Sequence, residues 1–221
     1  MSEMENDRFK ETIENHFPVT VLSRQYKNVD DLNKGLHEWI MGMAARHGDS
    51  DQNAARDPEI ATRGGYQTSR KVNVFRVDNP AIKQFRDRCV LPAVHHYLRT
   101  VFGEQAKKIE PNLVGWSNVL GTGDWQGPHM HPTESNLVSG VYYVHLPECT
   151  PPEGCIEFLN PHPISQHHGF SPSRRLIPHE GQILLFPPFY THYVHPLRSG
   201  KDRTIIAFDV LARSSKLSFT F

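Results

Sequence analysis

Two histidines, His129 and His131, stand one residue apart in the stretch "GPHMHPTESNLVSGVYYVHLP", just before a run typical of a β-strand. Alternate side chains of an extended strand point to the same face, so the two imidazoles would lie about 6.5–7 Å apart along the backbone. A third histidine, His192, stands where another strand is predicted to begin. Three imidazoles meeting on one face would give Fe(II) three protein ligands and leave up to three coordination positions open.

Histidine is concentrated in this part of the chain. The sequence holds 14 histidines, nine of them between His129 and His195, so the pair is either half of a metal site or a coincidence in a histidine-rich protein. His195, three residues after His192, is expected on the opposite face of its strand. Structural or surface roles are predicted for the histidines of a helix (His95, His96) and of strand ends and loops (His145, His162, His167, His168, His179).

An arginine, Arg203, begins the last apolar strand predicted in the sequence, "RTIIAFDV", eleven residues after His192. A buried arginine without a partner would destabilise the fold by several kcal/mol, whereas a bidentate carboxylate would satisfy its guanidinium. Arg203 is therefore a candidate anchor for the far carboxylate of a bound 2-oxo acid.

The composition excludes several classes of protein. With 24 basic and 24 acidic residues in 221, the chain offers no electrostatic argument for binding nucleic acid or an anionic membrane. No apolar run approaches the roughly 20 residues of a membrane span, and the polar start does not resemble a secretory signal. Three cysteines without framework spacing fit a reducing compartment. A cytoplasmic protein with its thiols free is therefore expected.

Two helices are predicted in the first half of the chain, over residues 30–48 and 79–103. The first has apolar residues at helical spacing, Asp30 or Asp31 as its cap and Gly48 as its stop. The second begins at Asn79 and is expected to kink or divide at Pro92. Between them, residues 71–77 are predicted to be extended.

From Leu113 onward the sequence changes to short apolar runs rich in Val, Ile, Tyr and Phe and separated by Gly and Pro. This pattern is typical of a β-sandwich or barrel. The predicted fold is mostly β with flanking helices: a double-stranded β-helix, or jelly roll, packed on N-terminal helices. Residues 1–112 would be the N-terminal extension and residues 113–221 the core, together forming one structural domain.

The core resembles the 2-oxoglutarate/Fe(II)-dependent oxygenases of the double-stranded β-helix superfamily. The matching pieces are, in order, "HMHP", "SGVYYVHLP", "GCIEFLNP", "GQILLFPPFYTHYVHPL" and "RTIIAFD", between about Leu113 and Val210. The resemblance implies an enzyme that uses O2, decarboxylates 2-oxoglutarate to succinate and CO2, and oxidises a substrate C–H bond, usually by hydroxylation. It also implies that His129 and His192 bind Fe(II), and that Arg203 and Tyr143 bind 2-oxoglutarate. His131 is the third predicted metal ligand, from its spacing to His129.

The sequence departs from the superfamily pattern at His131, where a carboxylate is usual. With three neutral imidazoles, the predicted metal site has one negative charge fewer than a site built from two histidines and a carboxylate. Cupins share the barrel, and in that alternative Glu134 is a rival ligand and Arg203 has no special task. A cupin-type metal enzyme, or a small-molecule binder, would not use 2-oxoglutarate. A binding module without metal is the third interpretation of the histidines.

The substrate cannot be identified from the residues. A small molecule or a peptide is expected. Loops such as "PISQHHGFSPSRR" and the Trp125 region are expected to shape the pocket that binds it. The sequence leaves the oligomeric state open, although exposed sheet edges and the C-terminal "KLSFTF" could pair with a second copy of the chain to form a homodimer.

Overall fold

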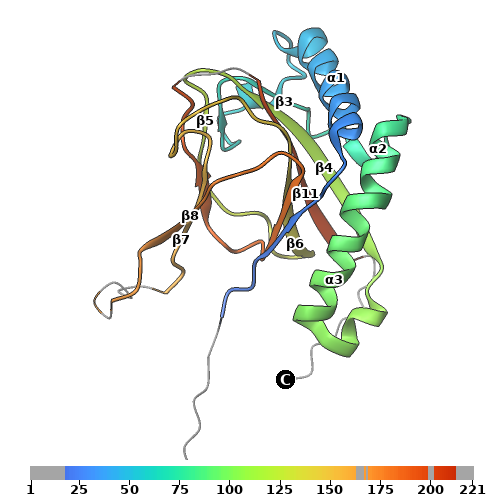
Figure 1. Cartoon of the computed structure of the whole chain (residues 1–221), viewed down its shortest axis with the longest axis vertical. Coiled ribbons are helices and arrows are strands. Elements are labelled where there is room, and N and C mark those ends of the chain that lie inside the picture. The colour runs from blue at the N-terminus through green and yellow to red at the C-terminus, as the bar shows by residue number, and fades with distance from the viewer. Residues whose placement is uncertain (1–17, 163–166, 168, 199–201, 213–221) are drawn as a thin grey trace, which may run out of the picture.

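The computed structural model describes residues 18–162, 167, 169–198 and 202–212. Two antiparallel sheets face each other, and helices cover the outer side of one of them (Figure 1). The strands are β1 (Leu22–Gln25), β2 (Thr62–Arg63), β3 (Tyr66–Gln67), β4 (Pro111–Leu120), β5 (Trp125–His129), β6 (Asn136–His145), β7 (Ile156–Leu159), β8 (Ser173–Leu176), β9 (Gln182–Phe186), β10 (His192–Val194) and β11 (Arg203–Ala212).

The six-stranded sheet has the order β1-β9-β6-β11-β4-β3, and the five-stranded sheet has the order β2-β5-β10-β7-β8. Successive strands of the core cross repeatedly from one sheet to the other, which is the topology of a double-stranded β-helix. The predicted fold class is therefore confirmed. Residues before Leu113 supply β1, β2 and β3, so the described part of the N-terminal extension adds strands to both sheets.

Strand alternation divides the six-stranded sheet into two faces with separate apolar cores. On β6, Tyr142 packs with the helices and its hydroxyl donates to Asn33 Oδ1 at 2.7 Å, whereas Tyr143 faces the space between the sheets. On β11, Ile206 and Phe208 face the helices, and Ile205 faces the interior. The interior of the barrel is lined by one side chain in two from each strand.

The helical layer consists of α1 (Asp30–His47), α2 (Pro80–Phe85) and α3 (Leu91–Phe102), with 3-10 turns η1 (Ala54–Arg56), η2 (Val74–Arg76) and η4 (Gly103–Lys108). Figure 1 shows the three helices along the outer side of β6, β11 and β4. The cap at Asn79 was predicted correctly, since its Oδ1 accepts from Ile82 N at 3.2 Å. At α1 the prediction was wrong: Val29 is the N-cap residue, and the two aspartates lie in the first turn.

Two local predictions require correction or refinement. Residues 71–77 are not a strand, because the Asn73 side chain accepts from Phe75 N at 3.1 Å and donates to Leu113 O at 2.8 Å, holding the 3-10 turn η2. The second predicted helix does divide, at the π-helical segment η3 (Arg86–Val90) just before Pro92. Proline at this position clashes with the carbonyl four residues earlier, which the wider π turn relieves.

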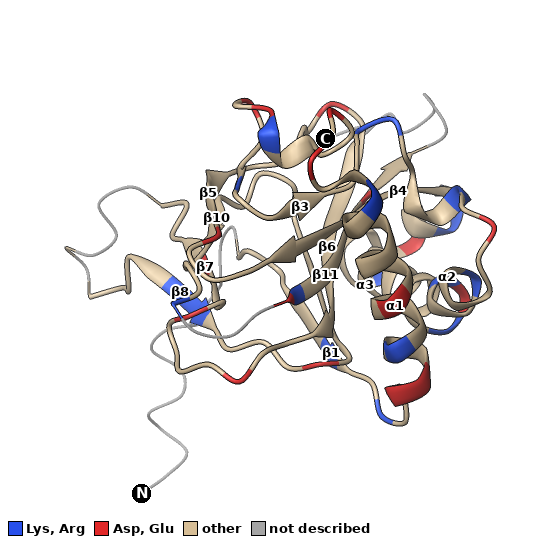
Figure 2. Cartoon of the chain, turned by 90° about the horizontal axis from the view of Figure 1, so that it is seen from above, with Lys and Arg blue, Asp and Glu red and all other residues tan. Residues whose placement is uncertain are grey.

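The charged residues and the cysteines can now be placed on the fold. In the view of Figure 2, acidic and basic residues are interspersed along the helices and loops. Cys89, Cys149 and Cys155 are all free thiols. Within the described residues, no helix is both long enough and apolar enough to cross a membrane. The segment "KLSFTF", which the sequence suggests could pair with a second copy, lies outside the described residues.

Candidate metal and co-substrate site

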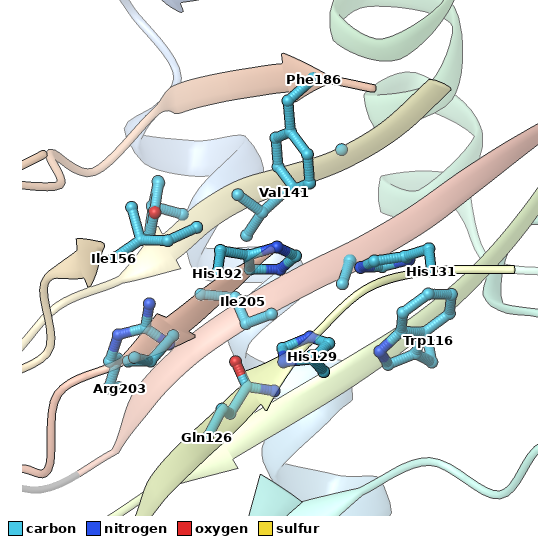
Figure 3. Close-up of a pocket in the computed structure, with 14 residues that line it drawn as sticks. Trp116, Gln126, His129, His131, Val141, Ile156, Phe186, His192, Arg203 and Ile205 are labelled. Atoms are coloured by element: carbon cyan, nitrogen blue, oxygen red, sulfur yellow. The ribbon is translucent and has the colours of Figure 1, made fainter. Parts of the chain in front are cut away.

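Three imidazoles meet between the two sheets (Figure 3). His129 ends β5, His192 begins β10, and the two are register partners with ring centroids 4.3 Å apart. The ring of His131 lies 5.4 Å from that of His192 and 5.6 Å from that of His129. One nitrogen from each ring lies within 4.8 Å of the others, a spacing that allows all three to bind one ion.

The convergence of His129 and His131 has a different cause from the one predicted. β5 ends at His129, so strand alternation does not orient His131. Instead the chain leaves the strand, and the His131 amide donates to Pro188 O at 3.0 Å, in the connection between β9 and β10. The two histidines therefore reach the same point from a strand end and from the segment that follows it.

Each of the three imidazoles is held through its Nδ1 atom. His129 Nδ1 lies 2.7 Å from Gly127 O, and His192 Nδ1 lies 2.8 Å from Tyr190 O. His131 Nδ1 lies 2.8 Å from a carboxylate oxygen, Asp209 Oδ1. Because these acceptors carry no hydrogen, Nδ1 must be the donor in each ring. The unprotonated nitrogen is then Nε2, which is the atom left for a metal.

Burial keeps two of these rings neutral. It lowers the pKa of His129 to about 4, against the opposing effect of the bond to Gly127. The pKa of His192 lies well below its usual range because the ring is buried and the neighbouring imidazoles disfavour a positive charge. Metal ions bind neutral imidazole, so protons do not compete for these two ligands at neutral pH.

A cation and a phenol lie buried in the same pocket as the imidazoles. Arg203 and Tyr143 are 1% and 0% exposed, and the guanidinium lies 5.4 Å from the centre of the phenol ring. Arg203 Nε donates to Gly154 O at 3.1 Å, but Arg203 Nη1 and the Tyr143 hydroxyl have no hydrogen-bond partner among the described residues. Burial raises the pKa of Tyr143 to about 12, so its hydroxyl keeps its proton.

These two orphaned donors provide a test of whether a carboxylate fits the site. A buried donor without an acceptor costs about 1–3 kcal/mol, and more if it is charged. A bound carboxylate would accept from both groups at once and match the positive charge of the guanidinium. The donor set therefore fits a 2-oxo acid, and the three imidazole Nε2 atoms fit a divalent transition metal.

The pocket also contains residues that the sequence analysis did not single out. Trp116 and Gln126 line it beside the histidines (Figure 3). Asp209 accepts the hydrogen bond from Nδ1 of His131. Asp209 could have been found, because it interrupts the apolar run "RTIIAFDV" at an even spacing from Arg203 and so shares its face. Trp116 occupies the corresponding inward position on β4, opposite Ala207.

The other candidate residues lie apart from this group. The side chain of Glu134 is exposed and does not belong to the set of converging ligand atoms. His195 faces away from the pocket, and its Nε2 lies 2.7 Å from Glu157 Oε2. His95 and His96 are exposed on α3, and His145 pairs with Glu180 at 2.8 Å.

Comparison with known proteins agrees with this geometry. Residues 115–209 match the family model described as "Putative 2OG-Fe(II) oxygenase", where 2OG denotes 2-oxoglutarate. The matched segment contains the three histidines, Tyr143, Arg203 and Asp209. The match falls within the segment for which the sequence predicted this resemblance, and it confirms the resemblance. No curated protein matches the chain.

Solved structures of low sequence identity share the fold. A prolyl-4-hydroxylase from Pseudomonas putida is 14% identical with a TM-score of 0.61, covering 88% of this chain and 93% of its own. A prolyl hydroxylase from Trichoplax adhaerens, in complex with a hypoxia inducible factor peptide fragment, is 12% identical with a TM-score of 0.61, and the match covers 87% of this chain and 83% of its own. HygX from Streptomyces hygroscopicus, with nickel and 2-oxoglutarate bound, is 12% identical with a TM-score of 0.56, and the match covers 88% of this chain and 83% of its own.

Proposed function

We propose that this protein is a 2-oxoglutarate- and Fe(II)-dependent oxygenase that oxidises a C–H bond of a second substrate, with hydroxylation as the expected outcome. One observation carries the proposal. Three inward-facing imidazoles share a pocket with a buried cation and a buried phenol, and Arg203 Nη1 and the Tyr143 hydroxyl have no hydrogen-bond partner among the described residues. A binding site for metal alone would not need the last two groups.

The metal ligands in this proposal are Nε2 of His129, His131 and His192. The bonds at Nδ1 fix the tautomer and orientation of each ring before any ion arrives, which lowers the free energy needed to assemble the site. Glu134 is not assigned as a ligand because its side chain is exposed and outside the converging set.

The co-substrate is assigned to the other end of the pocket. Arg203 Nη1 and the Tyr143 hydroxyl would both donate to the distal carboxylate of 2-oxoglutarate. The guanidinium is fixed by its bond to Gly154 O and by the phenol ring beneath it. Gly154 has a φ of +64°, and a Cβ there would lie 3.3 Å from Arg203 Cδ, so this close support of the arginine favours glycine.

The chain's own contribution to catalysis is geometry and exclusion of water. Bound Fe(II) and 2-oxoglutarate would supply the oxidising power, by activating O2 with loss of CO2. Val141, Phe186 and Ile205 form apolar walls beside the histidines, which keep bulk water from the reacting atoms (Figure 3). The neutral imidazoles hold the metal, while Arg203 and Tyr143 orient the co-substrate toward it.

The second substrate is proposed to be a small molecule or a peptide segment. Structural neighbours include one in complex with a peptide fragment and HygX with hygromycin B bound. Met130, between two of the proposed ligands, and Phe189, beside the residue that binds the His131 amide, are 58% and 49% exposed and offer apolar contacts near the site. A cytoplasmic location is proposed from the three free thiols.

The proposal is tested by anaerobic titration of tag-free protein, first with Fe(II) and then with 2-oxoglutarate. We expect one equivalent of Fe(II) to bind, and a visible charge-transfer band to grow with 2-oxoglutarate and saturate. Metal binding without any affinity for 2-oxoglutarate would favour the cupin-type alternative. Failure to bind metal would overturn both enzyme assignments and leave a metal-free binding module.

A further inference from the structure

Asp209 is a carboxylate on the inner face of β11 that the proposed reaction leaves without a task. Its side chain is 13% exposed, and one oxygen, Oδ1, lies 2.8 Å from each of three groups: His131 Nδ1, Asn136 Nδ2 and Ser139 Oγ. Asn136 Nδ2 also donates to Ser139 Oγ at 3.0 Å, so the network around the carboxylate is internally connected. A buried carboxylate that accepts this many bonds is held in one orientation.

Among the three converging imidazoles, the partner of His131 is the exception. His129 and His192 are held by neutral backbone carbonyls two residues earlier in the chain, at Gly127 and Tyr190. His131 is held by an anionic side chain 78 residues later. A carboxylate on Nδ1 makes the opposite nitrogen more basic and a stronger donor to a metal than a carbonyl does.

The backbone around His131 increases its dependence on Asp209. His129 and His192 lie on paired strands, whereas His131 follows the end of β5. Its backbone N–H donates a hydrogen bond to Pro188 O, in the connection between β9 and β10. The rings of Trp116 and Phe186 lie 5.7 and 6.1 Å from the imidazole and restrict it without fixing its tautomer. The Asp209 bond fixes both the rotation of the ring and the nitrogen that carries the proton.

We infer that Asp209 is a positioning residue for the metal: its hydrogen bond to His131 Nδ1 places a negative charge directly behind one of the three imidazole ligands. This inference rests on the proposed function, because it assumes that His131 is a ligand. It also assigns Asn136 and Ser139 the task of holding Asp209. The ion would then be bound by three imidazoles of unequal strength, with His131 the strongest donor.

The first experiment compares metal affinity in the wild type and in Asp209→Asn. The asparagine keeps the shape and an acceptor oxygen but removes the charge. We expect Co(II) or anaerobic Fe(II) to bind about 10–100-fold more weakly, the range found for partners of metal-bound histidines. Glu157→Gln is the matched control, because Glu157 is also a carboxylate with little exposure, 8% for its side chain, and is hydrogen-bonded to a histidine outside the pocket. It should leave metal affinity unchanged.

The second experiment moves the charge instead of removing it. His131→Asp alone would place two carboxylates in contact and should bind metal poorly, since like charges at this distance repel. Adding Asp209→Asn to it should restore affinity, whereas a purely structural role for Asp209 predicts that the two losses accumulate. This double variant also keeps the test decisive if Asp209→Asn alone folds poorly.

The possible results separate the two proposals. If Asp209→Asn binds metal as tightly as the wild type, or if the double variant is weaker than both single variants, the inference about Asp209 is wrong and the proposed function stands. If the wild type itself binds no metal, the proposed function fails and the inference fails with it. The d–d spectrum of bound Co(II) should also change in Asp209→Asn, which a loss of folding stability alone would not produce.

Discussion

The five-stranded sheet has a histidine-containing polar cluster on each of its faces, and the two differ in one respect. On the inner face, His192 lies with the other two proposed ligands and Arg203. On the outer face, Glu157 accepts from Arg175 Nε at 2.8 Å and from His195 Nε2 at 2.7 Å, and Ser173 also donates to it. The outer cluster satisfies its buried carboxylate within the chain. In the inner cluster, Arg203 Nη1 and the Tyr143 hydroxyl have no partner within residues 18–162, 167, 169–198 and 202–212.

Whether buried polar groups find partners within the chain distinguishes groups that stabilise the fold from groups that bind a ligand. A buried polar group without a partner destabilises the folded state, and proteins rarely keep one without a reason. In the outer cluster, burial opposes ionisation of Glu157, but the bonds from Ser173, His195 and Arg175 outweigh it and lower its pKa to about 2. The comparison therefore assigns the outer cluster to stability and the inner one to ligand binding, and four substitutions test this assignment.

The largest effect is expected for metal binding. His192→Ala should abolish Fe(II) binding while leaving the fold intact, because the ring borders a pocket. The matched control is His195→Ala, three residues along the chain and on the outer side, which should keep full metal content. Metal analysis after anaerobic loading, with circular dichroism as a check of folding, measures both. Equal iron in the two variants would remove the functional distinction between the faces.

The next effect concerns the co-substrate. Arg203→Leu should weaken 2-oxoglutarate binding by roughly 2–5 kcal/mol, the scale for truncating one partner of a buried charge pair. Arg175→Leu, which removes the arginine of the outer cluster, should leave this affinity unchanged. Isothermal titration with 2-oxoglutarate in the presence of an inert divalent metal measures the difference. Unchanged affinity in Arg203→Leu would support the cupin-type alternative.

A third substitution acts on stability and pH dependence in the outer cluster. The pKa of Glu157 is lowered in the folded protein from 4.5 to about 2, so its ionisation stabilises the fold above about pH 4.5, and this contribution is lost as the pH falls toward 2. Glu157→Gln should lose up to about 3 kcal/mol at neutral pH. Its deficit relative to the wild type should shrink on acidification, as followed by urea unfolding between about pH 6 and pH 3. A deficit independent of pH would contradict this account.

The smallest effect is expected for Tyr143→Phe, which should lower the affinity for 2-oxoglutarate without lowering the stability of the ligand-free protein. Tyr143→Phe removes a hydroxyl that has no hydrogen-bond partner in the part of the chain that the structure describes, so stability without ligand should stay equal or rise slightly. Affinity for 2-oxoglutarate should fall by about 1.5 kcal/mol, roughly tenfold, because the carboxylate loses one donor. Thermal unfolding with and without 2-oxoglutarate measures both. A clear loss of stability without ligand would mean that the hydroxyl has a structural role.

The sequence predicted the parts of this molecule that depend on local pattern. Period-two strands after Leu113 were sufficient for the fold class, and the resemblance, together with the spacing of the histidines, named five residues that the structure brings into one pocket. The turn at residues 74–76 was missed because a single side chain, Asn73, holds it by a bond to a strand 40 residues away. Asp209 was missed for the same reason, since its partner His131 is adjacent only after the sheets have closed.

The adjacent tyrosines of β6 also affect how this enzyme can evolve. Tyr142 is bonded to Asn33 of α1, and the next residue, Tyr143, faces the pocket. A one-residue insertion or deletion earlier in the strand would exchange their faces, yet it would still place a tyrosine in each layer. The phenol in the pocket would survive such a slip, while Ser139, which supports Asp209, would turn toward the helices. Length variation among descendants of this chain should therefore be confined to the loops on either side of β6.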